Sequence, residues 1–409
     1  MSDSRTLCQT CQDVPVREFL SLGTQPSVHF LANQEEADNE QVWPLALGFC
    51  EQCSLVQVME SVSERILFAG DDYHHMAGLT AGYRKHLRGL ADKLAGLYDS
   101  APAGRSVVEI GSNDGTLLDE LATRSFDVLG VDPVGAVSPG GSPVVRDYFD
   151  SSVATELRSS KGPADIVIAL NTFAHVTNLQ DVLDGVCTIL ADDGLFVTES
   201  HYLPDLIEDL QYDFAYHEHS RYYSLTALDA AFRLHGLETV RVERIPTHGG
   251  SIRVYAGFAG AHEIHESVTE LREYEHGLKL TDSMIYTEFA KRVEDHKDRL
   301  RRLIKELKST GARVGAVSAP ARAVTLLNYC ELGADEIDVI SEISPRKVGK
   351  LFPGTHVPII SQEELCGDGQ PDYALLLSWH IADEVAANLR KSGFRGKLIL
   401  PFPDLKIID

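Results

Sequence analysis

The sequence has few basic residues and no long hydrophobic run. Its 37 lysines and arginines stand against 61 aspartates and glutamates, which gives a net charge of −24. A chain of this charge repels nucleic-acid phosphates and anionic membranes, so we expect neither nucleic acid nor membrane among its partners. No window approaches the roughly 18 apolar residues that a membrane span needs, and the first residues lack the apolar core of a secretion signal. We therefore expect a cytoplasmic protein.

Cysteine is also scarce, with seven in 409 residues, and its spacing is not typical of a disulfide framework. Two CxxC pairs, 38 residues apart, contain Cys8, Cys11, Cys50 and Cys53. Each two-residue gap lets both thiolates reach one ion, and four thiolates close a tetrahedral zinc site with no open position for water or substrate. The pairs therefore predict structural zinc, with chance pairs of buried thiols as the alternative. The three single cysteines, expected in the core, are Cys187, Cys330 and Cys366.

The pattern of strands and helices predicts an α/β protein with three parts. We expect a small, strand-poor zinc-binding module over 1–80, a Rossmann-like domain over 81–261, and a C-terminal α/β domain with a parallel sheet over 262–409. The strands predicted in the last two parts are 106–110, 127–131, 166–170, 194–198, 252–258, 313–317, 337–340, 357–360, 373–377 and 397–400. Apolar residues at helical spacing predict a helix over 83–97 and one or two long amphipathic helices between 267 and 308.

A glycine-containing turn follows the first predicted strand of the second part. Residues 109–115 read Glu-Ile-Gly-Ser-Asn-Asp-Gly and open a helix, where glycines let the backbone approach a ligand closely. Asp132 ends the next strand, 23 residues after Glu109, where a carboxylate can accept from both ribose hydroxyls. NAD is the alternative ligand, but the phosphate turn G-x-G-x-x-G is absent, and a sulfonium cofactor has no pyrophosphate to hold. The pattern therefore predicts S-adenosylmethionine, bound by Glu109, Gly111, Asn113, Gly115, Asp132, Asp147 and Asn171.

The run Tyr216-His217-Glu218-His219 places four acid–base groups side by side. Attack on carbon needs a nucleophile that forms only after a proton leaves a carbon beside a carbonyl, so a carbon methyltransferase needs a positioned base. His219 titrates near neutrality and can take that proton, while a phenol or a protonated neighbour donates to the enolate oxygen. A metal site is one alternative, although in an extended segment Glu218 faces away from both histidines. A structural polar cluster is another.

These features together resemble the deoxysugar C-methyltransferases of antibiotic biosynthesis. The resemblance rests on the four-cysteine module, the segment 109–115, and Tyr-His-Glu-His-x-x-Tyr-Tyr-Ser-Leu over 216–225. It extends nearly end to end, through 173–176, 247–253, 325–329, 353–359 and 371–373. Members of that family use S-adenosylmethionine to methylate C3 of a 4-keto deoxysugar linked to thymidine diphosphate, and they carry zinc in the N-terminal module. The resemblance implies the same reaction and substrate class here, and a monomer.

The resemblance also implies roles for individual residues. It makes His219 the base, places Tyr216 and Glu218 in the same pocket, and makes His175 a second pocket histidine. Glycines in 247–253 would let a substrate oxygen approach the backbone, although a hairpin connection is the alternative. A diphosphate needs charge-assisted donors, which this acidic chain offers only locally. The residues expected to contact the substrate are Tyr73, His75, His248, Gly249, Arg253, Arg322 and Lys347.

Two segments depart from the family pattern. Residues 72–78 read Asp-Tyr-His-His-Met-Ala-Gly where relatives carry Tyr-x-Tyr or Tyr-x-Phe, and residues 321–324 read Ala-Arg-Ala-Val where relatives carry Ala-Lys-Gly-Asn. Both lie where substrate contacts are expected, so methylation at C5, or of an enolisable molecule that is not a sugar, is the first alternative. A non-catalytic ligand-binding protein is a further alternative, which the clustered base disfavours.

Overall fold

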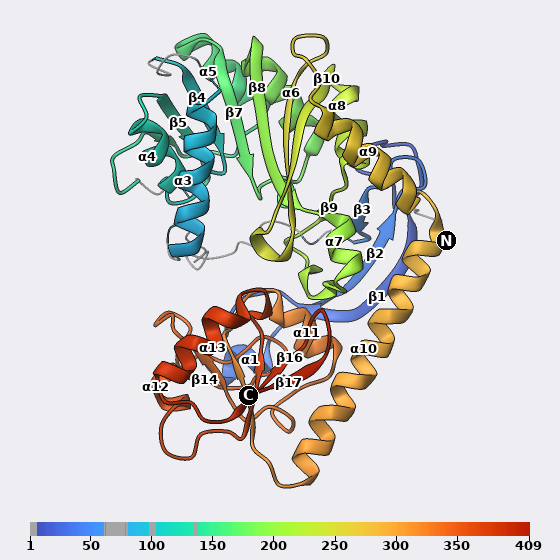
Figure 1. The fold of residues 1–409 in the computed structure, drawn as a ribbon, viewed down its shortest axis with the longest axis vertical. Helices are drawn as coiled ribbons and strands as arrows, with labels where there is room; N and C mark the ends of the chain where they lie inside the picture. Colours follow the sequence, from blue (N-terminus) through green and yellow to red (C-terminus); the bar gives the residue numbers. More distant parts are fainter. Residues whose placement is uncertain (1–5, 61, 63–77, 79–80, 98–103, 135–137) are drawn as a thin grey trace.

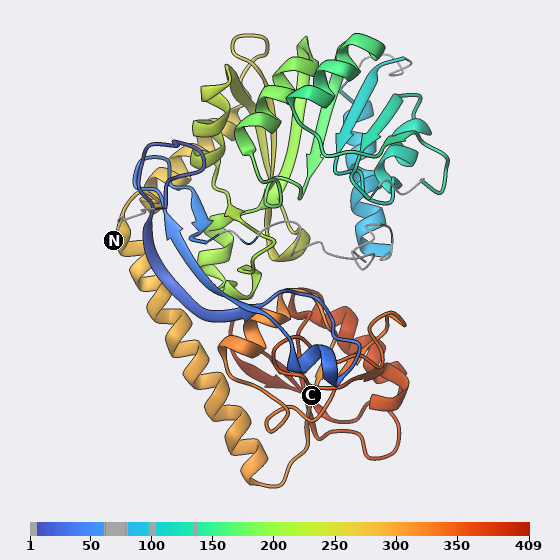
Figure 2. The same cartoon turned by 180° about the vertical axis from the view of Figure 1, so that it is seen from behind.

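The computed structural model describes residues 6–60, 62, 78, 81–97, 104–134 and 138–409. Within them the chain forms three sheets, of four, seven and six strands. In Figures 1 and 2 the seven-stranded sheet lies in the upper body and the six-stranded sheet in the lower one, while β1 and β2 run between the two along one side. The predicted α/β fold class is confirmed.

The N-terminal sheet is larger than expected, so the prediction of a strand-poor module is wrong. Its order is β1-β2-β3-β9, with every pair antiparallel. Buried Leu20 and Leu22 alternate with exposed neighbours in β1, but two register shifts against β2 interrupt the pattern and obscure it in the sequence. The elements are β1 (Arg17–Pro26), α1 (Gln34–Asp38), β2 (Val42–Phe49), β3 (Val56–Val58) and β9 (Arg221–Tyr222).

The seven-stranded sheet has the order β10-β11-β8-β7-β4-β5-β6. The strands β4 to β8 are parallel to one another. Beside β8, β11 and then β10 add an antiparallel edge. Two predicted strands match β4 and β5 to the residue, whereas β8 continues to 201 instead of ending at 198. The elements are α3 (Ala81–Ala95), β4 (Ser106–Ile110), α4 (Thr116–Ala122), β5 (Asp127–Val131), β6 (Val144–Val145), α5 (Ser151–Lys161), β7 (Ala164–Leu170), α6 (Leu179–Ile189), β8 (Leu190–His201), α7 (Leu203–Glu208), η2 (Tyr212–Phe214), α8 (Leu225–Leu234), β10 (Leu237–Ile245), η3 (Thr247–Gly249) and β11 (Ser251–Phe258).

The six-stranded sheet has the order β14-β13-β12-β15-β16-β17 and is parallel except for β17. The two long helices before it, α9 (Glu266–Leu278) and α10 (Ser283–Ser309), confirm the predicted amphipathic helices. The strand predicted over 337–340 is wrong in its bounds, because Ile337 is buried in a loop and β13 begins only at Ile340. The elements are β12 (Val314–Val317), α11 (Ala323–Tyr329), β13 (Ile340–Glu342), β14 (Ile359–Ser361), α12 (Gln362–Leu365), β15 (Tyr373–Leu376), η4 (Trp379–Ile381), α13 (Ala382–Lys391), β16 (Lys397–Leu400) and β17 (Lys406–Ile408).

The N-terminal sheet joins the two α/β bodies. One apolar core runs from β1 and β2 past α10 into the six-stranded sheet, and another joins the cysteine turns to the seven-stranded sheet. Leu31 bridges to Leu351, and the Glu40 carboxylate accepts from the N–H of Gly354 at 3.0 Å and from His356 Nε2 at 2.8 Å. These contacts join the N-terminal segment to the lower body. Among the described residues no helix is long and apolar enough to cross a membrane.

Candidate functional site

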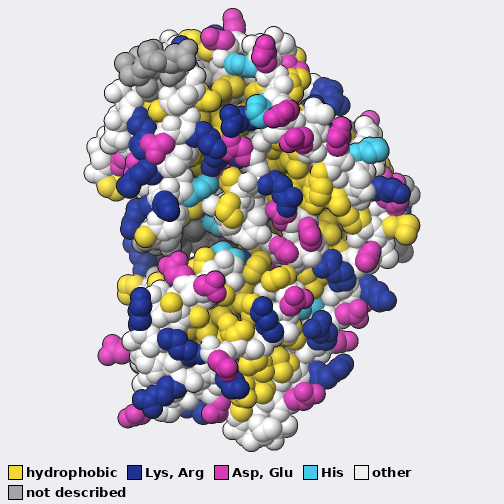
Figure 3. Space-filling view, viewed as in Figure 1, with side chains coloured by type: hydrophobic (Ala, Val, Ile, Leu, Met, Phe, Trp, Pro, Cys, Tyr) yellow, Lys and Arg dark blue, Asp and Glu magenta, His cyan; other side chains and the backbone are white. Residues whose placement is uncertain are grey.

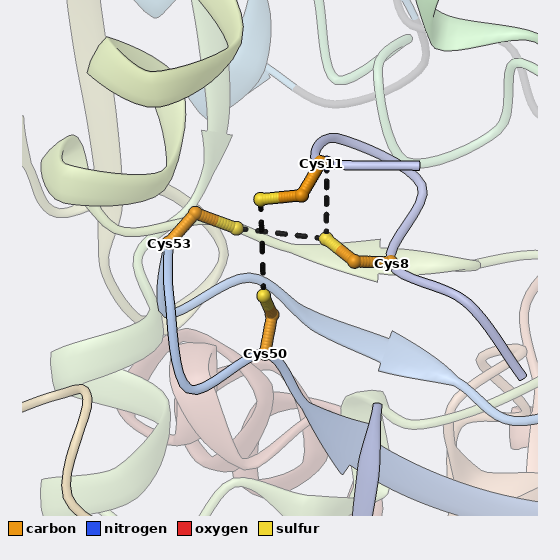
Figure 4. A group of neighbouring side chains, drawn as sticks. All are labelled: Cys8, Cys11, Cys50 and Cys53. Atoms are coloured by element: carbon orange, nitrogen blue, oxygen red, sulfur yellow. Dashed lines mark hydrogen bonds between the residues drawn. The ribbon is translucent and has the colours of Figure 1, made fainter. Parts of the chain in front are cut away.

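Four cysteine thiols come together beside the N-terminal sheet, and in Figure 4 all four point toward one another. The sulfur of Cys8 lies 3.6 Å from that of Cys53, the sulfur of Cys11 lies 3.9 Å from that of Cys50, and all four lie within 4.8 Å of one another. Tetrahedral zinc with Zn–S bonds of about 2.3 Å separates its sulfurs by about 3.8 Å. The thiols therefore fit a zinc ion, and four of them leave no position for water or substrate.

The two CxxC turns share one backbone form. Gln12 N–H donates to the Cys8 carbonyl at 2.8 Å and Ser54 N–H donates to the Cys50 carbonyl at 2.9 Å, and both Gln12 and Ser54 have positive φ. The hydroxyl of Ser54 lies 2.9 Å from that of Ser224, whose side chain caps α8. The cysteine turns are therefore hydrogen-bonded to the upper body as well as to each other.

The carboxyl groups of Glu109, Asp114 and Asp132 converge at the carboxyl ends of β4 and β5. Glu109 is buried, and its pKa lies well above the ordinary value, first because of burial and then because Asp132 and Asp114 are close. Among the described residues, neither Glu109 Oε2 nor Oδ1 of Asn171, which follows β7, has a hydrogen-bond partner. A ligand that brings donors or positive charge satisfies these acceptors. The edge therefore fits S-adenosylmethionine, which carries an ammonium, a sulfonium and two ribose hydroxyls.

Asp132 follows β5, and the turn after β4 holds its carboxylate. Its Oδ2 accepts from Asn113 N–H at 2.9 Å and its Oδ1 from Val134 N–H at 2.9 Å. Asp147 is exposed after β6, where its Oδ1 accepts from Tyr148 N–H at 2.8 Å. The two predicted cofactor carboxylates are thus oriented by backbone donors.

At the two glycines of the turn, protein side chains occupy the space that a Cβ would need, and the close approach of the backbone to a ligand stays a prediction. Gly111 has φ 70° and Gly115 has φ 71°, a conformation that glycine adopts without strain. A Cβ on Gly111 would lie 2.6 Å from Thr172 Oγ1, and one on Gly115 would clash with Ser138. Any contact of these two residues with a cofactor therefore comes from the backbone.

Arg253 was expected at the substrate, and the structure corrects this. Its guanidinium lies 2.5 Å from a carboxylate oxygen of Glu199 and 3.2 Å from one of Glu243, and its side chain is only 5% exposed. The same Glu199 lies 2.8 Å from His86 Nε2 on α3. Burying a carboxylate is costly unless a cation pairs with it, so Arg253 neutralises Glu199 within the sheet.

His219 lies in a cluster of rings at the carboxyl edge. Its Nε2 is 2.7 Å from the hydroxyl of Tyr216, and its ring centroid is 4.7 Å from that of His175, which follows β7. Burial, and then the neighbouring histidines, hold the pKa of His219 well below its ordinary value. The ring is therefore neutral, which is the form that accepts a proton. The structure brings the predicted base together with two of its predicted neighbours.

Residues 216–219 form a turn, so the expectation of an extended segment is wrong. His219 N–H donates to the Tyr216 carbonyl at 2.9 Å. His217 points elsewhere, because its Nε2 donates to the Pro44 carbonyl at 3.0 Å and its ring packs against Trp43. The two histidines thus have separate partners, and His217 joins this turn to the N-terminal sheet.

Arg221, which the sequence analysis did not single out, holds the loop that carries His175. Its guanidinium donates to the carbonyls of Phe173 at 3.1 Å, Val176 at 2.6 Å and Thr177 at 3.1 Å. Arg221 also opens β9, which pairs with β3 of the N-terminal sheet. The N-terminal module therefore helps to position both pocket histidines. No local pattern identifies Arg221, because its acceptors lie more than 40 residues away.

Glu218, in the same turn, is a half-buried acid. Burial raises its pKa from 4.5 to about 8, and no charged neighbour contributes. Desolvation disfavours the carboxylate, so this side chain keeps its proton at neutral pH. A protonated carboxyl group can donate a hydrogen bond, which an ionised one cannot.

A buried arginine lies where the lower body meets the carboxyl edge. The guanidinium of Arg322 stacks between the rings of Phe214 and Trp379, 4.6 and 4.8 Å from their centroids. Its Nη2 donates to Nδ1 of His380, and its Nε lies 3.6 Å from the Asp213 carboxylate. Within the described chain its Nε and Nη1 have no hydrogen-bond partner. A fixed guanidinium with unused N–H groups suits an oxyanion.

The segment 247–250 connects β10 and β11 as a hairpin. A Cβ on Gly249 would lie 3.1 Å from Gln211 Oε1 and 3.2 Å from the Trp379 ring, so protein occupies the space expected for substrate. His248 has φ 58°, and its ring centroid is 5.4 Å from that of Tyr83. The hairpin therefore places His248, and not Gly249, toward the other rings of the site.

Lys347 is engaged within the protein. Its ammonium donates to the Ala319 carbonyl at 2.7 Å and lies 4.7 Å from the ring centroid of Phe30. This placement corrects the expectation of a free phosphate-binding lysine. Tyr73 and His75, the other expected contacts, lie outside the described residues.

Comparison with known proteins gives three successive family matches. Residues 8–68 match the family described as "Putative zinc binding domain", residues 82–242 match "Methyltransferase domain", and residues 246–403 match "C-methyltransferase C-terminal domain". The chain is also 33% identical over 414 residues to C-methyltransferase NovU of Streptomyces niveus, in an alignment that covers 98% of this chain and 96% of NovU. The similarity therefore spans all three parts of the chain.

Solved structures give weaker matches. The magnesium protoporphyrin IX methyltransferase of Synechocystis PCC 6803 is 14% identical, over 44% of this chain and 84% of that chain, with a TM-score of 0.32. CalO1, a methyltransferase in calicheamicin biosynthesis, is 16% identical, over 44% of this chain and 56% of that chain, with a TM-score of 0.33. Neither TM-score is high enough to support a conclusion.

Proposed function

The chain belongs to the C-methyltransferase family and is an S-adenosylmethionine-dependent methyltransferase, and from this premise we propose that it methylates C3 of a 4-keto deoxysugar linked to thymidine diphosphate. The observation that carries the proposal is the pair of Tyr216 and His219, 2.7 Å apart between Oη and Nε2. A carbon acceptor needs such a base, because its nucleophile forms only when a proton leaves. The unused N–H groups of Arg322 support an anionic acceptor such as a nucleotide sugar.

When bound, S-adenosylmethionine supplies the methyl group. We assign the cofactor to the carboxyl ends of β4, β5 and β7, where two buried acceptors, Glu109 Oε2 and Asn171 Oδ1, have no hydrogen-bond partner within the described part of the chain. The Glu109 carboxyl group, whose pKa burial raises, offers a hydrogen-bond acceptor to the cofactor, and the Asp132 carboxylate accepts from the ribose hydroxyls. The other residues assigned to this site are Gly111, Asn113, Gly115, Asp147 and Asn171.

Asp132→Ala is expected to weaken S-adenosylmethionine binding by about 10- to 100-fold, because a charged acceptor of two hydrogen bonds is lost, at about 1.5–3 kcal/mol. Asp132→Asn keeps one acceptor oxygen and should fall in between. Titration calorimetry measures the affinities, with Asp127→Ala at the other end of β5 as the matched control. Wild-type affinity in Asp132→Ala would remove this residue from the cofactor site.

The catalytic residues act on the carbon beside the ketone. His219 takes the proton from this carbon, and the electron pair of the broken C–H bond forms a C=C bond while the carbonyl pair moves onto oxygen. Tyr216 and protonated Glu218 are donors for that oxygen, and His175 packs against the base. The carbon would then bond to the methyl group that S-adenosylmethionine supplies, as the C=O bond returns and the bond between methyl and sulfur breaks with its electron pair left on sulfur.

The role of Glu218 predicts a pH dependence. Because its pKa is about 8, the donor is present at neutral pH and is lost as the pH rises through about 8, so kcat/KM should fall there. Glu218→Gln donates at every pH and should abolish this alkaline limb. The unfolded carboxyl ionises near 4.5 and the folded one near 8, so the free energy of unfolding should also decrease as pH rises between these values. An alkaline limb that persists in Glu218→Gln would assign it to another group.

The zinc module stabilises this arrangement and supplies no chemistry to methyl transfer. Its ligands are Cys8, Cys11, Cys50 and Cys53. Four thiolates leave zinc without an exchangeable position, so a catalytic role for the ion is disfavoured. The small-molecule acceptor needs no second macromolecule, and action as a cytoplasmic monomer stays a prediction.

The proposed function is tested with methyl-labelled S-adenosylmethionine and a panel of thymidine-diphosphate 4-keto deoxysugars. Mass spectrometry of fragmented products locates the label on the ring. Label at C3 supports the proposal, and label at C5 corrects the position. Transfer to none of the sugars, with the cofactor bound normally, would overturn the substrate class and direct the search to other enolisable ketones.

A further inference from the structure

His201, the last residue of β8, lies beside the proposed base but has no part in the function described so far. Its ring centroid is 5.2 Å from that of His219, 5.7 Å from that of His248 and 4.2 Å from that of Phe214. It reaches this edge because β8 runs to residue 201. In Figure 3, histidine side chains lie on the face where the upper and lower bodies meet.

The Nε2 atom of His201 is shielded from solvent and, among the described residues, has no hydrogen-bond partner. A buried polar nitrogen without a partner costs about 1–3 kcal/mol. The close ring of Phe214 restricts how the imidazole can turn. This nitrogen is therefore a fixed polar group, next to the base, whose hydrogen-bonding capacity the protein itself does not use.

His201 has one permanently charged cationic neighbour, Arg322. Burial first, and then His248, Arg322, His175 and His380, hold the pKa of His201 well below its ordinary value. A neutral imidazole has one N–H donor. With so low a pKa, His201 does not compete with His219 for the substrate proton. The potential that disfavours an imidazolium favours negative charge on an atom bound at the same place.

We propose that His201 is a further catalytic residue, which donates a hydrogen bond from Nε2 to the carbonyl oxygen of the acceptor substrate. The inference rests on the proposed function, in which this oxygen gains negative charge when His219 removes the neighbouring proton. His201 keeps its own proton throughout, because it stabilises the oxygen and transfers nothing. Its place beside His219 matches the substrate, in which the ketone and the acidic C–H are on adjacent carbons.

The test compares His201→Phe with His201→Gln in two reactions. Methyl transfer is one, and exchange of the acidic substrate proton with deuterium oxide, with S-adenosylhomocysteine bound, is the other. Both need the enolate, so His201→Phe should slow both by about 10²–10³-fold, the usual cost of one lost oxyanion donor. His201→Gln, whose amide N–H extends about as far as Nε2, should recover part of both rates.

Three outcomes decide the inference. A matched control, His265→Asn at the exposed N-cap of α9, should keep wild-type rates. Equal rates in His201→Phe and the wild type would overturn the proposal, and so would a Phe variant that loses cofactor affinity or thermal stability together with activity. A wild-type protein that neither exchanges nor methylates any ketone would instead overturn the proposed function.

Discussion

His219→Asn is expected to lower kcat for methyl transfer by about 10²–10⁴-fold, the usual contribution of a positioned general base. The substitution keeps a polar side chain, but it removes the basic nitrogen and, being shorter, does not reach the Tyr216 hydroxyl that Nε2 contacts. His219 is 6% exposed, so bulk water cannot easily replace it as the proton acceptor. The cofactor acceptors at β4 and β5 are unchanged, and affinity for S-adenosylmethionine should stay within about twofold. Quenched-flow assays with labelled cofactor measure the rate.

The neighbouring histidine provides a matched control for this experiment. His217→Gln, whose amide N–H extends about as far as Nε2, can still donate to the Pro44 carbonyl and should retain near-wild-type activity, because His217 faces the N-terminal sheet. Wild-type kcat in His219→Asn would overturn the role of His219. In that case the same assay on His175→Asn shows whether this ring, at 4.7 Å from His219, is the base instead.

Cys50→Ser is expected to abolish stoichiometric zinc binding and to lower the thermal midpoint by about 6–12 °C. The estimate assumes that loss of zinc lowers the free energy of unfolding by about 3 kcal/mol, and that each kcal/mol lowers the midpoint by about 2–4 °C. The assumed loss is smaller than the full zinc contribution in isolated zinc fingers, because here the sheet also packs in two apolar cores. Cys50 is buried, and its replacement removes one of the four thiolates that complete the tetrahedral site. Metal analysis and calorimetry measure the two effects.

Zinc loss should also slow methyl transfer, because β3 pairs with β9 and Arg221 of β9 holds the loop of His175. Cys366→Ser is the matched control, since this cysteine lies outside the cluster. It should keep the wild-type zinc content, midpoint and rate. Full zinc content in Cys50→Ser would contradict a four-thiolate site, and an unchanged midpoint without zinc would contradict a structural role for the ion.

Local patterns predicted much of this protein correctly. The strands β4 and β5 and the four cysteine ligands are specified by residues close in sequence, so periodicity and spacing identify them. The N-terminal strands were missed, because register shifts in β1 break the alternation that reveals a strand. The turn at 216–219 was taken as extended, because four polar residues carry no periodic signal for either form.

Charge alone misidentified two of the three expected cationic contacts. Arg253 and Lys347 are basic residues in an acidic chain, yet a carboxylate pair holds one and a carbonyl with a ring holds the other. Their partners come from other elements, and no local pattern reveals them. Arg322 differs from these two residues, because its partners stack on the two faces of the guanidinium. Among the described residues, its Nε and Nη1 groups at the edge have no hydrogen-bond partner.

The sequence by itself determined the four-cysteine cluster, the α/β class, the glycine-containing turn after β4 and a histidine three residues after a tyrosine. Each of these depends on residues a few positions apart or on the period of one strand or helix. Only the tertiary structure decided which histidines gather at His219, because His175 and His201 contact its ring, His248 contacts His201, and the three come from separate parts of the sheet edge. Burial and the positive potential at that edge arise from packing of the two bodies, so the neutral state of these rings is a property of the assembled fold.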